Sequence, residues 1–198
     1  MVSQAALKRN YEVANVKIEW DWLHWNCSQT WGADVWPELQ RRGVKQQDLE
    51  RCVYVIRLNG LFAIQYPLGV SPTVYIGEGN FEQRITQHKN WLMELADLQG
   101  EYEFLIGYCF PRARNASKVY SDFEAMLIHE FRDIYGAAPL RNRQMEFQKS
   151  NHVFEPINEI RSAIMVGRGM RFHWAVQPMK SSPMYDVYQR TILEELRA

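Results

Sequence analysis

The sequence predicts an α+β domain with a small, mainly antiparallel sheet that is flanked by helices and carries N- and C-terminal extensions. The length of 198 residues fits a single domain spanning residues 1–198. Hydrophobic residues make up 46% of the chain, which is enough for a packed core. Near residue 80 the spacing of apolar residues changes from the period of strands to that of helices, which indicates both kinds of element.

The first strands are expected within residues 52–76. Cys52 to Leu58 is a run rich in β-branched residues that ends at Asn59-Gly60, a dipeptide typical of hairpin turns. Leu61 to Tyr66 is therefore expected to return beside it as the second strand. Val74 to Ile76 is a further strand, and glycines follow it.

Two helices with a strand between them follow. From Asn80, a suitable N-cap, apolar residues recur at helical spacing up to a stop at Gly100. Tyr102 to Phe110 is the strand expected between the helices. Ser117 to Tyr135 repeats the helical spacing, and Gly136 ends it.

The pattern weakens beyond Pro139. We expect a helix near Asn158 to Val166, a strand near Arg171 to Val176 and a last helix from Pro183 to Leu196.

Extensions flank the core on both sides. No repeat or flexible linker divides the chain, so we expect a Trp-rich N-terminal extension at residues 1–50 and a basic C-terminal extension at 144–198 around a core at 51–143. Lys and Arg together number 23, as do Asp and Glu, so no overall positive charge indicates nucleic acid as a partner. Any basic patch must be local, and residues 141–198 carry the basic excess.

Five of the seven tryptophans lie between Trp20 and Trp36. Trp20 and Trp22 have the same strand parity, so we expect them on one face. They could form a platform on which unpaired bases stack, or a satellite core that packs the extension onto the domain. The second interpretation is favoured because buried aromatic rings are strongly stabilising.

Cysteine usage and hydropathy indicate a cytoplasmic protein without a membrane segment. The three cysteines are widely spaced and never form a CxxC pair, so neither a disulfide framework nor a zinc site is indicated. Charged residues interrupt the N-terminal region where an export signal would be apolar. Prolines and glycines interrupt the longest uncharged run.

The residues that carry chemistry follow one another in a defined order: Tyr54, Tyr75-Ile76-Gly77, Arg84, His88, Glu124 and Pro139-Leu140-Arg141-Asn142. Arg84 and His88 are four residues apart, which places them on one side of a helix. In this order and joint spacing, the region from Arg51 to Arg143 resembles the GIY-YIG nuclease superfamily, in particular its stand-alone restriction endonucleases of similar size.

The resemblance implies catalytic roles for Tyr54, Tyr75, Arg84, His88 and Glu124. Tyr54 would activate the attacking water, which requires nearby cations such as Mg²⁺ and Arg84 to lower its pKa from about 10. Tyr75 would donate a hydrogen bond to the phosphate or contact the water.

The chemistry of the other side chains agrees with these roles. Arg84 presents a forked guanidinium to phosphate oxygens, and His88 can accept or relay a proton near neutral pH. Glu124 adjoins an apolar helix stripe, where a carboxylate needs a cation as its partner. One carboxylate with phosphate oxygens and waters suffices for Mg²⁺, so Glu124 is the expected ligand, with Mn²⁺ as a substitute metal.

Two matching positions are expected to support the site, and two departures affect it. Gly77 and Asn142 match residues that hold the family's site together. The first motif reads Cys52-Val53-Tyr54, so only its tyrosine is retained. Gly79 stands where many members have a small hydroxyl residue, which removes one hydrogen bond. Neither departure excludes activity.

The sequence thus predicts a Mg²⁺-dependent endonuclease that hydrolyses DNA, with a site-specific restriction enzyme as the first interpretation. The alternatives are a structure-selective or weakly specific DNA nuclease, as in repair, a mobile element or a toxin, and an inactive nucleic-acid-binding module. A palindromic recognition site would imply a homodimer. The candidate DNA contacts are Arg112, Arg114, Lys118, Arg141, Arg143, Lys149, Arg168 and Arg171.

Overall fold

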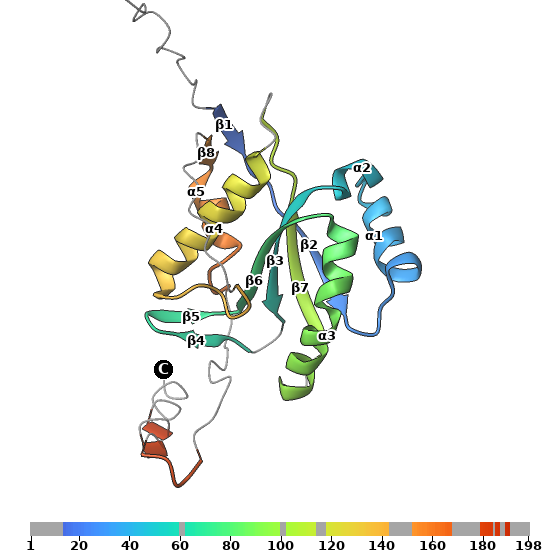
Figure 1. Ribbon diagram of the computed structural model, residues 1–198. Coiled ribbons are helices and arrows are strands. Elements are labelled where there is room, and N and C mark those ends of the chain that lie inside the picture. Colours follow the sequence, from blue (N-terminus) through green and yellow to red (C-terminus); the bar gives the residue numbers. More distant parts are fainter. Residues whose placement is uncertain are drawn as a thin grey trace, which may run out of the picture.

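A computed structural model describes residues 14–59, 62–99, 102–113, 118–142, 152–167, 179–183, 185–186 and 189–190. At its centre is a four-stranded antiparallel sheet in the order β2-β7-β3-β6 (Figure 1). These strands are β2 (Asp21–Asn26), β7 (Glu103–Cys109), β3 (Cys52–Leu58) and β6 (Thr73–Gly79). The expected class, a mixed α+β protein with a mainly antiparallel sheet, is confirmed.

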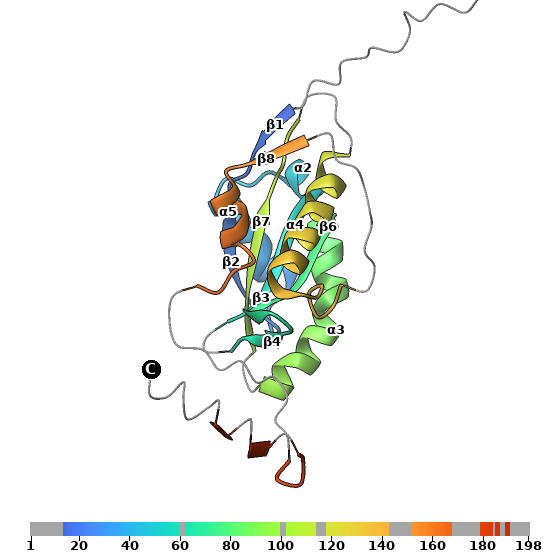
Figure 2. The same cartoon turned by 90° about the vertical axis from the view of Figure 1, so that its left-hand side faces the viewer.

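Helices cover both faces of this sheet. On one face lie α3 (Phe81–Gln99) and α1 (Trp36–Arg41), and on the other lie α4 (Val119–Tyr135) and α5 (Ile157–Ser162) (Figure 1). Figure 2 shows α4 and α5 on the viewer's side of the sheet. Because side chains alternate along each strand, every strand contributes to both layers.

The N-terminal extension is built into the sheet. Its strand β2 pairs with β7 through all of its residues. Trp20 packs on Trp22 and on Phe123 of α4, with ring centroids 6.3 and 6.0 Å apart. Trp22 lies so close to Gly107 that a Cβ there would come within 2.8 Å of the indole. These tryptophans pack against the core, which supports the second interpretation of the Trp-rich segment.

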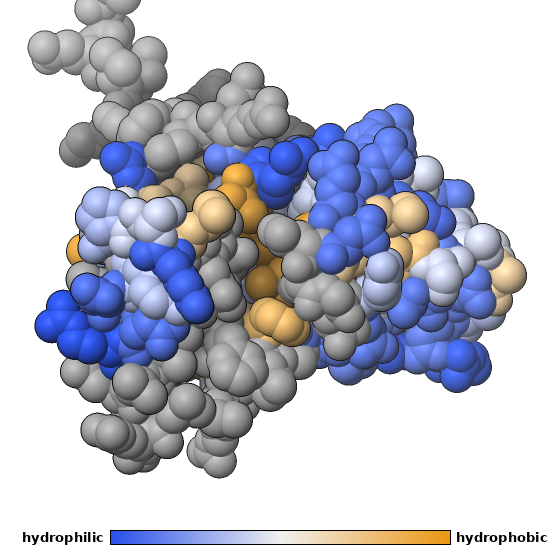
Figure 3. All heavy atoms as spheres, turned by 90° about the horizontal axis from the view of Figure 1, so that it is seen from below, coloured by the Kyte–Doolittle hydropathy of each residue, from blue (hydrophilic) through white to orange (hydrophobic). Residues whose placement is uncertain are grey.

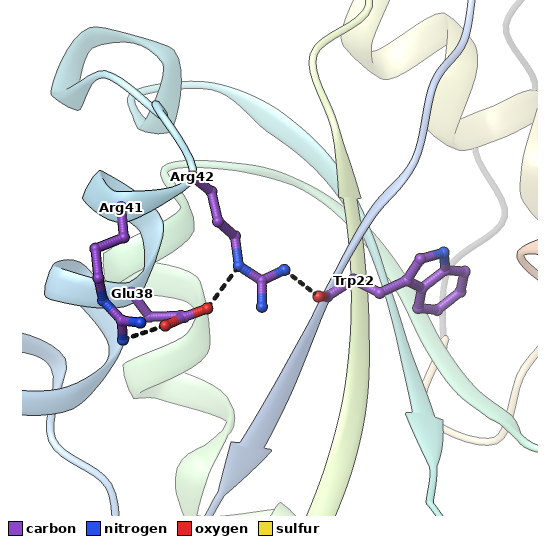
Figure 4. Close-up of polar contacts among 4 residues, drawn as sticks. All are labelled: Trp22, Glu38, Arg41 and Arg42. Carbon is purple, nitrogen blue, oxygen red and sulfur yellow. Dashed lines mark hydrogen bonds and ion pairs between the residues drawn. The ribbon is translucent and has the colours of Figure 1, made fainter.

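The chain between β2 and the core is anchored on the outer edge of β2. It forms one π-helical turn, η2 (Trp31–Val35), and continues into α1. Arg42 donates from Nε to Glu38 at 2.8 Å and from Nη1 to the carbonyl oxygen of Trp22 at 2.5 Å (Figure 4). Arg41 pairs with the same Glu38 carboxylate. One carboxylate therefore orients both arginines, and Arg42 ties α1 to the strand. The short helix α2 (Gln46–Leu49) follows.

The two extensions meet on the α4 side. β1 (Ala14–Lys17) pairs in parallel with β8 (His152–Glu155), a pairing that the sequence pattern did not indicate. The chain after α5 is held by side chains of the core that donate to its carbonyl oxygens. Arg57 donates to Ser162 and Met165, and Ser71, Thr73 and Tyr135 donate to Ile164.

The expected pairing across Asn59-Gly60 is wrong. The partners of β3 are β6 and β7, one on each side, whereas β4 (Ile64–Tyr66) forms a separate hairpin with β5 (Gly69–Ser71). Every residue of β3 is buried, so it occupies the centre of the sheet. Longer strands fill both of its sides because they bury more apolar surface than the three residues of β4 can.

The expected helices around β7 are confirmed. α3 begins after Asn80, whose Oδ1 accepts the Gln83 amide at 3.0 Å, and α4 ends at Gly136, which has φ of 78°. α5 ends at Ser162, earlier than expected. The strand expected at 171–176, and most of the last helix at 183–196, lie outside the described residues.

The surface between the two helical layers is partly apolar. Figure 3 shows apolar side chains along the middle of the face seen from below, with hydrophilic surface over the layer on the right. Within the described ranges, no helix combines the length and the apolar composition that a membrane span requires.

Candidate functional site

Four of the expected catalytic side chains form one hydrogen-bonded group on the α3 face, which we call the tyrosine cluster: Tyr54, Tyr75, Arg84 and His88. The Oη atom of Tyr54 lies 2.8 Å from Nε2 of His88. Arg84 donates from Nε to Tyr54 Oη at 3.3 Å and from Nη2 to Tyr75 Oη at 2.7 Å. The rings of Tyr75 and His88 pack with centroids 4.5 Å apart. The cluster thus joins two strands and one helix.

The sheet register and one glycine bring the two tyrosines together. Tyr54 lies opposite Gly77 in the β3–β6 pair, and Tyr75 shares that face because it is two residues before Gly77. A Cβ on Gly77 would lie 2.7 Å from Tyr54 Oη and 2.5 Å from the Tyr75 ring. Glycine is therefore required sterically. Gly79 has φ of 130°, a conformation that side-chain-bearing residues rarely adopt, which explains why no hydroxyl residue stands there.

Tyr54 is a phenol in the free protein. Its side chain has 0% exposure, and burial raises its pKa above the ordinary value, with a further increase from Tyr75 and a smaller opposing effect of Arg84. The sequence predicted a lowered pKa, and the protein groups around Tyr54 do not supply it. The burial effect outweighs the one cation that touches the oxygen.

His88 is a neutral imidazole near neutral pH. It is 7% exposed, and burial, followed by Arg84 and Arg141, lowers its pKa to about 4. The expectation that it relays protons near neutral pH relied on an unshifted imidazole. Within this site it acts first as a hydrogen-bonding partner of Tyr54.

Two neighbours extend the cluster, and sequence reasoning missed the role of the first. Trp91 donates its Nε1–H to Nδ1 of His88 at 3.0 Å, and the Arg141 guanidinium lies 5.0 Å from the Trp91 ring centroid. The available signal was the spacing, because Trp91 follows His88 by three residues on one helix.

Asn142 holds the turn after α4 against the free edge of β6. Its amide makes both hydrogen bonds that a neighbouring strand would make to Ile76, accepting from the backbone N–H at 2.9 Å and donating to the carbonyl oxygen at 2.7 Å. The Arg141 amide donates to the Val74 carbonyl oxygen at 2.9 Å. This contact brings Arg141 to Trp91, so Asn142 supports the site through the backbone.

Glu124 is the one expected catalytic residue on α4. This helix packs against β6 and β3, the strands that carry Tyr75 and Tyr54. The Glu124 side chain is half-buried beside the buried Phe123 and Leu127, at the margin of the apolar face as expected. Asp122, two residues before Glu124, is hydrogen-bonded to His152, with 2.8 Å between its Oδ2 and Nδ1 of the histidine.

The donor set suits one kind of metal. Among the described residues, no group of three or more His, Cys, Asp or Glu side chains could hold an ion, so a closed zinc-type cage is not formed by them. A single carboxylate is a hard oxygen donor, and Mg²⁺ typically takes one or two carboxylates with phosphate oxygens and water. Glu124 offers one such ligand, and the other ligands of a Mg²⁺ ion would have to come from substrate and water.

The described candidates for DNA contact are spread over the molecule. Arg112 is exposed and paired with Asp48 at 2.6 Å, Lys118 is exposed next to the start of α4, and Arg141 lies beside the cluster. The other five candidates lie outside the described residues: Arg114, Arg143, Lys149, Arg168 and Arg171.

A pocket of about 380 Å³ lies at a different place, between β2 and α1. Leu23, Pro37 and the ion-paired Glu38 and Arg42 line it, and no residue of the tyrosine cluster does. Arg41 and Arg42 in its lining already share the Glu38 carboxylate, so the tyrosine cluster is the stronger candidate for a functional site.

Comparisons with protein-family models, with curated proteins and with solved structures found no match to this chain. The case for a function therefore depends on the residues and their geometry.

Proposed function

We propose that this chain is a Mg²⁺-dependent DNA endonuclease of the GIY-YIG type, which hydrolyses phosphodiester bonds. The observation that carries the proposal is the tyrosine cluster. Its members were selected from the sequence alone, through their order, their spacing and the resemblance that these imply, yet Tyr54 and His88, 34 positions apart, share a hydrogen bond. A chance match of spacing would not require these side chains to touch.

Arg84 is the group that would meet the phosphate. It is partly exposed, and its guanidinium is shared among the phenol oxygens of Tyr54 and Tyr75 and the amide oxygen of Gln87. A charged phosphate oxygen is a stronger acceptor than a phenol, and the guanidinium fork matches it. Moving Arg84 to the phosphate neutralises charge there and uncovers Tyr54, which is inaccessible in the free protein.

Tyr54 is the proposed general base. With Arg84 at the phosphate, Tyr54 would be open to solvent and would lose its phenol proton to a solvent water. The phenolate Oη, still hydrogen-bonded to His88, would then take a proton from the attacking water. Tyr75, released by the same movement of Arg84, would donate a hydrogen bond from its hydroxyl group to a phosphate oxygen. Glu124 would hold Mg²⁺, which supplies positive charge for the developing negative charge at phosphorus.

A restriction-type enzyme is the preferred form of this proposal. The N-terminal extension contributes a strand to the sheet, so it is part of the nuclease domain. The packing of Trp20 and Trp22 removes the main argument for a single-stranded substrate. Specificity for a palindromic site would require a homodimer, because a two-fold site is read by a two-fold protein.

Incubation of the purified protein with plasmid DNA and Mg²⁺, followed by sequencing of the fragment ends, tests the proposal. Discrete bands with a common end sequence are expected. A smear would favour the weakly specific nuclease, and binding without cleavage in Mg²⁺ or Mn²⁺ would favour the binding module and overturn the proposal. Arg84→Ala protein prepared in the same way controls for contaminating nucleases.

A further inference from the structure

Both ring nitrogens of His88 are occupied by protein groups. The indole Nε1 of Trp91 lies 3.0 Å from Nδ1, and Oη of Tyr54 lies 2.8 Å from Nε2. His88 is buried with 7% exposure. The partners of its two nitrogens therefore decide where the imidazole carries its proton.

The partner on Nδ1 allows only one answer. An indole N–H can donate a hydrogen bond but cannot accept one. Nδ1 must therefore be the acceptor and carry no proton. A neutral imidazole has one N–H, so the proton of His88 resides on Nε2 and points to Tyr54 Oη.

The surroundings of His88 exclude the doubly protonated form near neutral pH. An imidazolium would turn an N–H on Nδ1 against the N–H of Trp91. The charged groups that act on the ring are the two cations Arg84 and Arg141, which together with burial disfavour a third positive charge.

Trp91 is itself held in place from two sides. The Arg141 guanidinium lies over its ring at 5.0 Å, and the Tyr75 ring packs beside it with centroids 6.3 Å apart. Arg141 is in turn fixed by its backbone bond to Val74. The indole N–H is thus presented to His88 by the turn after α4 as well as by α3.

We propose that Trp91 is a positioning residue that fixes His88 as the Nε2–H tautomer, so that His88 donates a hydrogen bond to Tyr54 Oη. The inference rests on the proposed function for its effect on cleavage. Two donors, His88 and Arg84, then face the same phenol oxygen. When Arg84 moves to the phosphate, the His88 donor remains on Oη and stabilises the phenolate. Because Nε2 already carries a proton, His88 cannot receive the Tyr54 proton, which leaves to a solvent water.

Nitrogen NMR of the full chain labelled with ¹⁵N tests the tautomer directly. In the wild type at neutral pH, Nδ1 of His88 should resonate as an unprotonated nitrogen and Nε2 as a protonated one. A scalar coupling between Trp91 Nε1 and His88 Nδ1 should be measurable across the N–H···N hydrogen bond. A protonated Nδ1 in the wild type would overturn the proposal without the use of any variant.

Trp91→Phe removes the N–H donor and keeps an aromatic ring beneath Arg141. We expect the Nδ1–H tautomer to gain population and the cleavage rate to fall about tenfold, the effect of one lost hydrogen bond. Trp31→Phe is the matched control, since Trp31 packs edge-on against Phe81 and belongs to no hydrogen bond of the cluster. It should retain both the tautomer and the rate.

The failure of this inference differs from the failure of the proposed function. A slower Trp91→Phe enzyme with an unchanged tautomer would overturn the inference, because the effect would then be structural. A wild-type protein with the expected NMR signals that never cleaves DNA would refute the nuclease function and the catalytic role of Trp91, while the tautomer assignment would hold.

Discussion

The two faces of the central sheet carry their candidate catalytic groups in different ways. On the α3 face, Tyr54 and His88 are buried and joined by hydrogen bonds, with Arg84 and Tyr75 at the partly exposed margin. On the α4 face, the carboxylate of Glu124 is half-buried at the margin of an apolar helix.

Because of this difference, substitutions on the two faces should affect stability and cleavage to different degrees. A buried polar group must be hydrogen-bonded, because leaving it unpaired costs free energy. Changes to the buried part of the tyrosine cluster should therefore reduce both stability and cleavage. A shape-preserving change at Glu124 should reduce cleavage far more than stability, so the predictions below test whether the two faces can be separated in this way.

The largest expected effect is that of Glu124→Gln. The amide keeps the shape of the side chain but loses the charge that holds Mg²⁺, so cleavage should fall by at least about 10³-fold. The free energy of unfolding, measured with urea, should change by no more than about 1 kcal/mol, because the amide keeps the packing of the side chain. Glu130→Gln on the same helix removes the ion pair with Arg161 and should still cleave. Normal turnover by Glu124→Gln would remove Glu124 from the site.

Tyr54→Phe should affect both quantities. Loss of the hydroxyl should lower cleavage by about 10²- to 10³-fold and stability by about 1–3 kcal/mol, because a buried partner on His88 is left unsatisfied. Tyr102→Phe is the matched control, since its hydroxyl bonds to Asp97 at the surface. An unchanged stability for Tyr54→Phe would mean that the face is less rigid than the hydrogen bonds indicate.

The pH profile identifies the titrating group. The pKa of Tyr54 is raised, so only a small phenolate fraction exists between about pH 6 and 9, and this fraction grows about tenfold with each pH unit. The wild-type rate should therefore increase throughout that range without levelling off. His88, with its pKa lowered to about 4, is already neutral throughout that range. Tyr54→Phe should lose the rising limb, and His88→Ala should be slower but retain it. A flat profile for His88→Ala would contradict this assignment.

Arg84→Ala should lower the single-turnover rate by about 10²-fold, because one preorganised cationic donor is lost. Arg84→Lys should recover part of the rate, since a point charge cannot form the fork. Lys89→Ala, on the same helix, controls for loss of a positive charge. Unchanged rates in both Arg84 variants would mean that this cation does not face the phosphate.

The smallest expected effect concerns stability and pH. The pKa of His88 is lowered from its ordinary 6.5 to about 4 in the folded protein, so the unfolded chain binds more protons between these values. The contribution of neutral His88 to the free energy of unfolding is complete above about pH 6.5 and is lost as the pH falls. Between pH 7 and pH 5 this contribution amounts to about 2 kcal/mol.

Urea unfolding of the wild type and of His88→Asn at both pH values measures that contribution. The variant should lose about 2 kcal/mol less stability than the wild type on acidification. His24→Asn, at an exposed position of β2, should behave as the wild type does. Equal losses in wild type and His88→Asn would show that the ring is not held neutral by its surroundings.

Local signals made the helices and the contacts of α3 predictable. Asn80 and Gly136 bound α3 and α4 because caps act within a few residues. Arg84 and His88 are one helical turn apart, so their common side follows from helix geometry alone. Trp91 could have been added to them on the same grounds.

The partners of strands were harder to predict, because pairing depends on segments far apart in the sequence. The Asn59-Gly60 signal describes a turn but not the competition for β3, which the longer β6 and β7 win. The contribution of β2 to the sheet and the parallel β1–β8 pair arise from packing across the whole chain. The burial that raises the pKa of Tyr54 has the same origin, since no local residue pattern reports it.

Two side chains that bond to the backbone of the outer strands also help this protein to avoid aggregation. Unpaired backbone groups along an edge strand are a template for strands of other molecules. Asn142 makes hydrogen bonds to both the N–H and the carbonyl oxygen of Ile76 on β6. Arg42 donates to the carbonyl oxygen of Trp22 on β2. Each side chain stands where the backbone of another molecule would otherwise add. Both edges of the four-stranded sheet are thereby guarded against growth into intermolecular β-structure.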